Sequence, residues 1–326
     1  MMKKTRVLMV GAGSWANEVF YPSLAEIEEI EVAAICTRTE RRLHKTADRY
    51  GVKGRYTDLE KMLTSEEADA AYVIMSPHLV FDPTIAVLRH KLPVFIEKPP
   101  ALTAFQVRSF AREAEKNGVF CMVGFNRRYI PLVNDALRWV AAEGPLTQVM
   151  CQYMKHRSPV YIDGAIDAIG CDAIHAVDTV RYLAGSDADV EEVHAVVGRY
   201  EGEEDNAWNA VLRFSNGVTG AILTNWCMGN RVFFMEIHAP GRSVFIDARE
   251  ESVTGVRLRD GKEEPFPLEG DAARKEFHAF YGHLDQNRHF IDCVRNGTPC
   301  RSTVQDAVKT MELVEALRKG RCARSL

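Results

Sequence analysis

A lysine at the end of an apolar segment is the residue best suited to chemistry in this sequence. Lys98 lies in the run Glu97-Lys98-Pro99-Pro100, directly after Val94-Phe95-Ile96. A free lysine has a pKa of about 10.4 and is a poor proton acceptor at neutral pH. Burial beside another positive charge would lower that pKa, and the two prolines stiffen the chain that aims the side chain. Lys98 is therefore predicted to exchange a proton with a substrate, the alternative being a surface lysine.

A glycine-rich turn lies between the first apolar segment and a helical stretch. Gly11, Gly13 and Ala16 have the G-x-G-x-x-G/A spacing in that context. Gly11 would permit a tight turn, Gly13 would let a pyrophosphate approach the backbone, and Ala16 is small enough for close helix packing. Amides near Ser14 and Trp15 would face the anion. The pattern predicts a dinucleotide site, and an ordinary glycine-rich turn is the alternative.

The end of the second apolar segment bears on which dinucleotide is bound. NAD-binding folds usually place Asp or Glu there, on the ribose hydroxyls. This chain has Thr37 and Arg38 instead, with Arg41 and Arg42 one turn later. Hydroxyl and guanidinium donors suit a 2′-phosphate, so NADP is predicted in preference to NAD; the alternative is a solvated basic helix start. Four more residues at strand ends are predicted cofactor contacts: Ser76, Pro77, Glu97 and Lys98.

A histidine with acidic neighbours is the second candidate proton carrier. His175 lies in the segment 171–183, whose apolar residues have helical spacing. On one such helix Asp172, His175 and Asp178 follow one another at intervals of three residues. A carboxylate-held histidine suits acid/base chemistry or binding of a substrate hydroxyl, and a buried structural histidine is the alternative. Cys171, His175 and Asp178 could instead bind zinc, but no fourth ligand is evident and hydride transfer needs no metal, so none is predicted.

The elements that must position these residues follow from the alternation of apolar and amphipathic runs. Through residue 124 this alternation is typical of a parallel sheet flanked by helices. The clearest helix is 104–117, which Thr103 can cap and Gly118 can end. Strands are predicted at 6–10, 31–36, 54–56, 70–75, 93–96 and 119–123. The fold class is therefore α/β, with residues 1–124 predicted as a Rossmann dinucleotide-binding domain.

Residues 125–326 are predicted to form an α+β domain that binds substrate and mediates oligomers. Ser215-Asn216-Gly217 is typical of a hairpin turn, so the sheet should be large, open and mostly antiparallel. Helices are predicted at 131–143 and 165–184, and a last helix, about 303–319, should pack back on the body. Strands are predicted at 146–154, 190–199, 207–214, 218–226, 232–239, 243–247 and 255–259.

Substrate contacts are predicted from residues near the carboxyl ends of the strands and near the histidine. These residues are Asn126, Arg127, Tyr153, Asp172 and His175. Arg127 or Arg128 could alternatively form a structural ion pair.

Composition excludes several classes of function. The chain has 326 residues, of which 46% are hydrophobic and 26% charged, as expected for two globular domains. Its net charge of -4 gives no electrostatic footprint for nucleic acid or an anionic membrane. No apolar run approaches the roughly 20 residues that span a bilayer. The eight cysteines are scattered and form no Cys-x-x-Cys pair, which favours a reduced, cytoplasmic chain acting on a small molecule.

With these motifs, the chain resembles the Gfo/Idh/MocA oxidoreductase family. The resemblance is carried by residues 11–16, by Glu97-Lys98-Pro99, by Gly124-Phe125-Asn126-Arg127-Arg128 and by Ile174-His175-Ala176-Val177-Asp178. It implies a Rossmann domain, a second domain whose open sheet often mediates dimers or tetramers, and NAD(P)-dependent chemistry on sugars or cyclitols. Lys98 matches the family's catalytic lysine and His175 its catalytic histidine. Many members have an aspartate four residues before that histidine, where this chain has Cys171, so Asp172 is the expected substitute.

The sequence thus predicts hydride transfer between NADP or NAD and a carbinol carbon of a sugar-like substrate. Lys98 and His175 would move the proton, and Asp172 would position His175. A homodimer or homotetramer is expected. One alternative is a non-enzymatic sensor, because the same family includes a galactose-pathway repressor that binds dinucleotide. Another is a reductase of a non-sugar carbonyl or a tetrapyrrole.

Overall fold

The computed structural model describes residues 4–320 and 323–324, which divide into two compact units. The first unit combines the residues up to Phe125 with His283–Val308. The second combines Asn126–Gly282 with the residues from Lys309 onward. The predicted division assigned 283–308 to the second domain, whereas the contacts of this segment lie mainly in the first unit. No helix within the described ranges has both the length and the apolar character needed to cross a bilayer.

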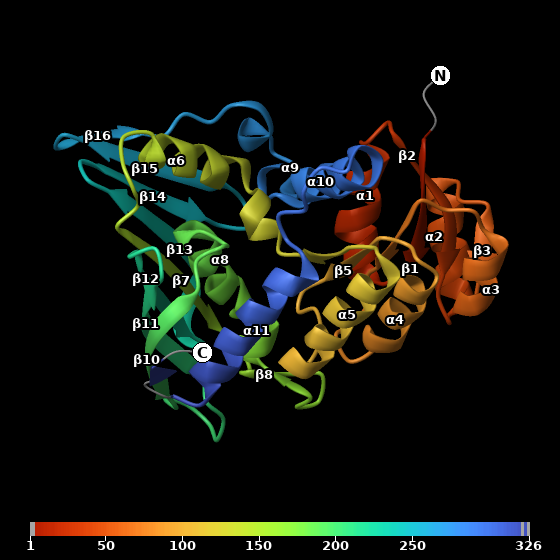
Figure 1. Ribbon diagram of the computed structural model, residues 1–326, viewed down its shortest axis with the longest axis horizontal. Helices are drawn as coiled ribbons and strands as arrows, with labels where there is room; N and C mark the ends of the chain where they lie inside the picture. The colour runs from red at the N-terminus through yellow and green to blue at the C-terminus, as the bar shows by residue number, and fades with distance from the viewer. Residues whose placement is uncertain (1–3, 321–322, 325–326) are drawn as a thin grey trace. The chain divides into compact units, whose positions relative to one another are not determined.

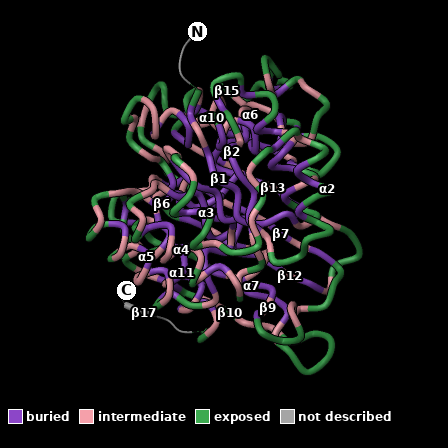
Figure 2. Tube along the Cα trace, turned by 90° about the vertical axis from the view of Figure 1, so that its right-hand side faces the viewer, coloured by how far each residue is buried: buried purple, intermediate pink, exposed green. Residues whose placement is uncertain are grey.

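The first unit contains a six-stranded parallel sheet in the order β3-β2-β1-β4-β5-β6 (Figure 1). This is the strand order of a Rossmann fold, as predicted. Both faces of the central strands are covered, so β1 and β4 are almost entirely apolar and buried (β1 in Figure 2). The strands are β1 Thr5–Val10, β2 Ile30–Cys36, β3 Gly54–Tyr56, β4 Ala70–Val73, β5 Val94–Glu97 and β6 Cys121–Gly124.

Local capping chemistry sets the ends of the helices between these strands. In α5, Ala104–Asn117, the Thr103 hydroxyl accepts a hydrogen bond from the Gln106 amide at 3.3 Å. The helix ends where Gly118 adopts a φ of 66°, and both ends are those predicted. The other helices are a π-helical turn η1 Ala16–Phe20, α1 Tyr21–Ala25, α2 Glu40–Tyr50, α3 Leu59–Ser65 and α4 Phe81–Arg89.

A segment from late in the chain completes the first unit. The helix α10, His283–Asn296, was not predicted. Its Phe290 ring lies 5.0 Å from that of Tyr72, and Asn287 donates a hydrogen bond to Ser23 at 2.9 Å. The following residues reach the sheet edge at β6, where the Val123 amide donates to the Ser302 carbonyl at 2.8 Å. The first unit is therefore assembled from two distant stretches of sequence.

The second unit contains a nine-stranded, mostly antiparallel sheet in the order β16-β15-β14-β13-β7-β12-β11-β10-β17. Within this sheet β7 and β12 pair in parallel, and the other described pairs are antiparallel. The predicted hairpin lies between β11 and β12, where Gly217 has a φ of 86°. The strands are β7 Gln148–His156, β10 Val190–Gly198, β11 Ala207–Phe214, β12 Thr219–Asn225, β13 Cys227–Ala239, β14 Arg242–Ala248, β15 Val253–Arg259, β16 Lys262–Pro265 and β17 Ala323–Arg324, with a separate pair β8 Val160–Tyr161 and β9 Ile166–Asp167.

Helices pack against the nine-stranded sheet of the second unit, and one of them carries His175. The helix α6, Pro131–Ala141, contacts β13, β14 and β15 (Figure 1). The helix α8, Ile174–Ala184, contacts β7 and β12. The remaining helices are η2 Asn126–Tyr129, α7 Ala168–Cys171, η3 Gly270–Ala273, α9 Phe277–Phe280 and α11 Val304–Arg318.

The predicted single helix 165–184 is wrong, because the chain forms α7 and α8 with a break between them. Asp167 caps α7 by accepting from the Gly170 amide at 2.9 Å. The Ala173 amide then returns to the Ala168 carbonyl at 2.8 Å, five residues back, which interrupts the α-helical ladder. Asp172 consequently precedes α8 instead of lying within it, and the predicted spacing from Asp172 along one helix face does not apply.

Candidate functional site

The glycine turn after β1 has the geometry that close phosphate approach requires. Gly11 has a φ of 116°, and a Cβ there would lie 2.2 Å from the Ile74 carbonyl oxygen. Only glycine fits such a position without moving Ile74, the residue after β4. A Cβ at Gly13 would meet no atom within 4 Å, so the space beside its backbone is open to a ligand. The turn therefore fits the pyrophosphate of a dinucleotide.

Polar side chains that sequence reasoning missed hold this turn in place. Asn17 donates to the Gly13 carbonyl at 3.0 Å and to the Thr46 hydroxyl at 3.1 Å. The Tyr21 hydroxyl donates to the Gly11 carbonyl at 3.2 Å. Nothing in the local pattern distinguishes Asn17 from a solvated helix residue, because its partner Thr46 lies in α2.

The other predicted members of the turn differ in exposure. Ala16 is 1% exposed and packs closely, as its small size allows. Ser14 is exposed. The Trp15 side chain is 42% exposed, and its ring centroid lies 5.5 Å from that of His283 in α10. Solvent therefore reaches the turn at Ser14 and Trp15.

The end of β2 offers positive charge near the glycine turn. The Gly11 amide donates to the Cys36 carbonyl at 2.9 Å, which joins the two strand ends. Thr37 is half-buried, and its amide donates to the Tyr56 carbonyl at 3.1 Å. Arg38, Arg41 and Arg42 are exposed, and none of them has an ion pair with another described residue. Their charge is available to a ligand.

Lys98 follows β5 at the same sheet edge, because the carboxyl ends of parallel strands lie together. Its amide donates to the carboxylate of Glu97 at 2.9 Å, and Glu97 is 7% exposed. The other Glu97 oxygen packs 3.2 Å from where a Cβ on Gly124 would lie. The buried carboxylate therefore fixes the backbone at Lys98, whose own side chain is partly exposed. Ser76 and Pro77 follow β4, exposed and half-buried respectively.

In the second unit, His175 is 4% exposed and lies in the first turn of α8. Its ring centroid is 6.3 Å from that of Tyr153 on β7. Tyr153 is itself 2% exposed and packs against Trp226 and Phe233. The histidine therefore sits at the edge of an aromatic cluster.

Asp172 is held by two residues that sequence reasoning did not single out. Lys155 donates to its carboxylate at 2.6 Å, and the Tyr161 hydroxyl donates to the same oxygen at 3.2 Å. Trp226 in turn donates to Tyr161 at 3.0 Å. Burial, and then the Asp172 charge, raises the pKa of Tyr161, which keeps the phenol protonated as a donor. Lys155 could have been found, because it shares a strand face with Tyr153.

Asp178 pairs with residues that helical spacing does not bring near it. Arg128 donates to both of its oxygens, at 2.8 Å from Nε and 2.5 Å from Nη2. Thr310 donates to it at 3.0 Å. This is the structural ion pair considered for Arg128, and it occupies the carboxylate that the zinc alternative would need alongside Cys171 and His175.

The two remaining predicted substrate contacts are buried. Asn126 is 2% exposed, and its amide donates to the Tyr281 carbonyl at 2.8 Å. Arg127 is 5% exposed, and its guanidinium carbon lies 3.9 Å from the Tyr281 ring centroid and 5.0 Å from that of Phe233. Their substrate roles remain predictions.

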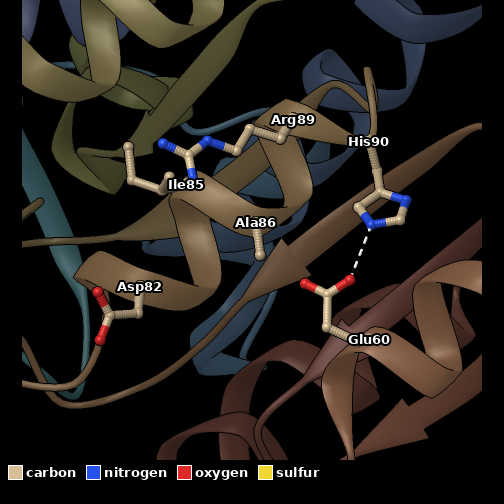
Figure 3. A pocket seen from close by; sticks show the side chains of 6 residues that line it. All are labelled: Glu60, Asp82, Ile85, Ala86, Arg89 and His90. Atoms are coloured by element: carbon tan, nitrogen blue, oxygen red, sulfur yellow. Dashed lines mark hydrogen bonds and ion pairs between the residues drawn. The ribbon is translucent and has the colours of Figure 1, made fainter.

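A hollow on the surface of the first unit lies apart from these residues. It is formed by α3 and α4, and the His90 ring and the Glu60 carboxylate meet across it at 3.1 Å (Figure 3). The residues that line it are Glu60, Asp82, Ile85, Ala86, Arg89 and His90. None of the predicted cofactor or substrate residues is among them.

Two family models match this chain. The model described as "Oxidoreductase family, NAD-binding Rossmann fold" matches residues 5–125, and that described as "GFO/IDH/MocA C-terminal domain" matches residues 144–241. The chain belongs to the Gfo/Idh/MocA family. The family resemblance and its two-part fold are thereby confirmed. The protein is an NAD(P)-dependent oxidoreductase, as its cofactor domain and family indicate.

Named relatives match over most of their length. A 4-carboxy-2-hydroxymuconate-6-semialdehyde dehydrogenase of Sphingobium is 26% identical, with 92% of this chain and 93% of the relative covered. The scyllo-inositol 2-dehydrogenase (NAD(+)) of Bacillus subtilis is 25% identical, with 83% and 81% covered. The crystal structure of aldose-aldose oxidoreductase from Caulobacter crescentus has a TM-score of 0.84 at 22% identity, with 99% and 100% covered, and shares the fold.

Proposed function

We propose that this protein transfers a hydride between NADP, in preference to NAD, and a carbinol carbon of a sugar-like or cyclitol-like substrate. The observation that carries the proposal is the Glu97-Lys98 element at the sheet edge that also bears the open glycine turn. A relative that acts on scyllo-inositol supports the substrate class. The preference for NADP is supported by exposed Arg38 without an ion-pair partner in the described chain and by the lack of an acidic residue directly after β2.

The bound nicotinamide would accept or supply the hydride, and the chain's own residues would move the proton. Lys98 is assigned to proton exchange with the substrate hydroxyl and to stabilising negative charge as it develops on that oxygen. Its backbone is held by Glu97, which fixes the point from which the side chain extends. Ser14, Trp15, Thr37, Ser76 and Pro77 are assigned to holding the dinucleotide.

His175 is assigned to the second proton-handling role. Its burial in the first turn of α8 restricts the ring, which favours a fixed direction for its donor and acceptor atoms. Asp172 is assigned to positioning, since Lys155 and Tyr161 fix its carboxylate. Asn126, Arg127 and Tyr153 are assigned to binding substrate hydroxyls.

The deciding experiment follows the near-ultraviolet absorbance of the reduced nicotinamide with NADP and NAD. The panel contains aldoses, cyclitols and a carboxylated semialdehyde, each tested in oxidation and in reduction. Turnover of a sugar or cyclitol with a lower KM for NADP supports the proposal. Turnover restricted to the semialdehyde would instead favour a non-sugar carbonyl, and cofactor binding without any turnover would favour a sensor.

The role of Lys98 is tested by Lys98→Ala, with Lys53→Ala as a matched exposed control in the first unit. Loss of a positioned acid/base should lower kcat by about 10²–10⁴ while calorimetry still detects cofactor binding. The control should keep its rate. An unchanged kcat in Lys98→Ala would rule out its role.

His175 and Asp172 are separated by their pH profiles. His175→Asn should lower kcat by about 10²–10⁴ and remove one limb of the pH–rate profile. Asp172→Asn should shift that limb without removing it, as expected of a positioning residue. A pH profile of His175→Asn identical to that of the unmodified protein would exclude proton transfer by His175.

A further inference from the structure

A histidine and two cysteines form a compact cluster in the first unit, away from the residues assigned to hydride chemistry. One ligand atom from each of His289, Cys293 and Cys300 lies within 4.8 Å of the others. His289 and Cys293 are four residues apart in α10 and share a helix face. The Sγ atom of Cys293 is 3.5 Å from Nε2 of His289. Cys300 approaches from the segment between α10 and α11.

We propose that this cluster binds one Zn²⁺ ion through His289, Cys293 and Cys300. Tetrahedral zinc has bonds of about 2.3 Å to sulfur and about 2.0 Å to nitrogen, which places ligand atoms roughly 3.5–4 Å apart. Separations within 4.8 Å reach that geometry with small side-chain movements. Two thiolates and a neutral imidazole balance the charge of the ion. Thiolate ligands also select zinc over magnesium or calcium, which prefer oxygen.

The cluster is both oriented and reachable before an ion arrives. The Arg301 amide donates to Nε2 of His289 at 3.1 Å, which makes Nε2 the unprotonated nitrogen that a metal requires, and this atom lies 3.5 Å from Sγ of Cys293. On binding, Nε2 exchanges that hydrogen bond for the metal. Cys293 is 4% exposed, whereas His289 and Cys300 are half-buried, so an ion can enter from solvent. Water would complete the coordination on the exposed side.

The position of the cluster gives the ion a structural consequence. Cys300 is two residues before Ser302, whose carbonyl accepts from the Val123 amide and whose hydroxyl donates to the Val123 carbonyl at 2.7 Å. Thr303 forms a bridge with Met122. Zinc would therefore link α10 to the segment that covers the β6 edge of the parallel sheet, and binding should stabilise the first unit.

The test uses the full-length protein, stripped with a chelator under a phosphine reductant and then titrated with Zn²⁺ against a colorimetric chelator. One equivalent should bind, and Co²⁺ in its place should give a thiolate-to-metal charge-transfer band. Zn²⁺ should also raise the thermal midpoint. Cys300→Ser and His289→Ala should lose stoichiometric binding and the stabilisation. The matched control Cys227→Ser, a half-buried cysteine of the second unit, should keep both.

The result is decided by the metal itself and not by activity. The proposal is overturned if the unmodified protein binds no equivalent of Zn²⁺, if Co²⁺ gives no charge-transfer band, or if Cys300→Ser binds as well as Cys227→Ser does. It is also overturned if the reduced protein binds no metal and hydrogen peroxide instead converts Cys293 and Cys300 to a disulfide. In that reaction each thiol loses a hydrogen, and hydrogen peroxide is reduced by two electrons to two water molecules. Mass spectrometry detects the disulfide as a loss of two hydrogens from the protein.

Discussion

Replacing Asp178 by alanine will destabilise the second unit because Asp178 neutralises a buried cation. The Arg128 side chain is 0% exposed and that of Asp178 is 1% exposed. The carboxylate accepts two hydrogen bonds from Arg128 and one from Thr310. Asp178→Ala leaves the guanidinium buried without this carboxylate, and α8 loses its ion pair with η2.

The size of the effect follows from the burial of both partners. Removing one member of a buried ion pair costs about 3–5 kcal/mol, because the remaining charge keeps its desolvation penalty. A loss of about 4 kcal/mol is nearly a thousandfold change in the unfolding equilibrium. The double variant Arg128→Met/Asp178→Leu should recover most of the loss, since replacing both charges with apolar groups of similar volume is often neutral.

Urea unfolding followed by tryptophan fluorescence measures this change in the second unit. Trp208 and Trp226 are 2% and 1% exposed there and report its unfolding. Asp178→Asn should lose less stability than Asp178→Ala and should keep kcat at temperatures where it is folded. The reasoning is refuted if Asp178→Asn is as stable as the unmodified protein but has lost turnover with an altered pH profile. That outcome would assign the carboxylate to His175.

Three further predictions concern the first unit. Gly11→Ala should weaken cofactor binding, measured by calorimetry, at least about tenfold, because the added Cβ would displace the Ile74 carbonyl. The control Gly51→Ala is also at positive φ, but its Cβ would meet no atom within 4 Å, so it should leave cofactor binding unchanged. Arg38→Ala should raise KM for NADP about 10–100-fold and leave KM for NAD unchanged, as expected for the loss of one charge-assisted hydrogen bond. Equal changes in KM for the two cofactors would show that Arg38 does not bind the 2′-phosphate. Hydrogen bonding from Cys293, and then from His289, lowers the pKa of Cys300 from 9.0 to about 5, so its alkylation in metal-free protein should persist until pH falls through about 5. Burial raises the pKa of Cys227, so its alkylation should already slow at a much higher pH than that of Cys300. Peptide mass spectrometry separates the two.

The features that were predicted correctly depend on short-range chemistry. The helix α5 was located from Thr103 and Gly118, which act on the backbone within a turn of themselves. The glycine turn was recognised because Gly11 must adopt a conformation that other residues resist. The parallel and antiparallel sheets followed from the periodicity of apolar residues, which reflects how many faces of a strand are covered.

The features that were missed depend on partners distant in the sequence. The apolar stripe of α10 is interrupted by Gln286 and Asn287, which are polar yet fully buried, so its periodicity was hidden. Helical spacing placed Asp178 beside His175, but it could not show that the carboxylate accepts hydrogen bonds from Arg128, fifty residues earlier. Lys155 could be noticed on the strand face of Tyr153, but its pairing with Asp172 depends on the tertiary structure. Spacing identifies residues that can interact, and tertiary contacts decide which of them do.

The return of residues 283–308 to the first unit sets an order for folding during synthesis. The six parallel strands leave the ribosome early, but α10 and the segment on β6 are made only after the whole stretch 126–282. Until then Phe95 and Tyr72 lack the ring of Phe290, and the β6 edge can pair with another chain. The first unit is therefore completed only after 126–282 has been made, and the second only by the residues from Lys309 onward. A fragment ending at Phe125 should aggregate.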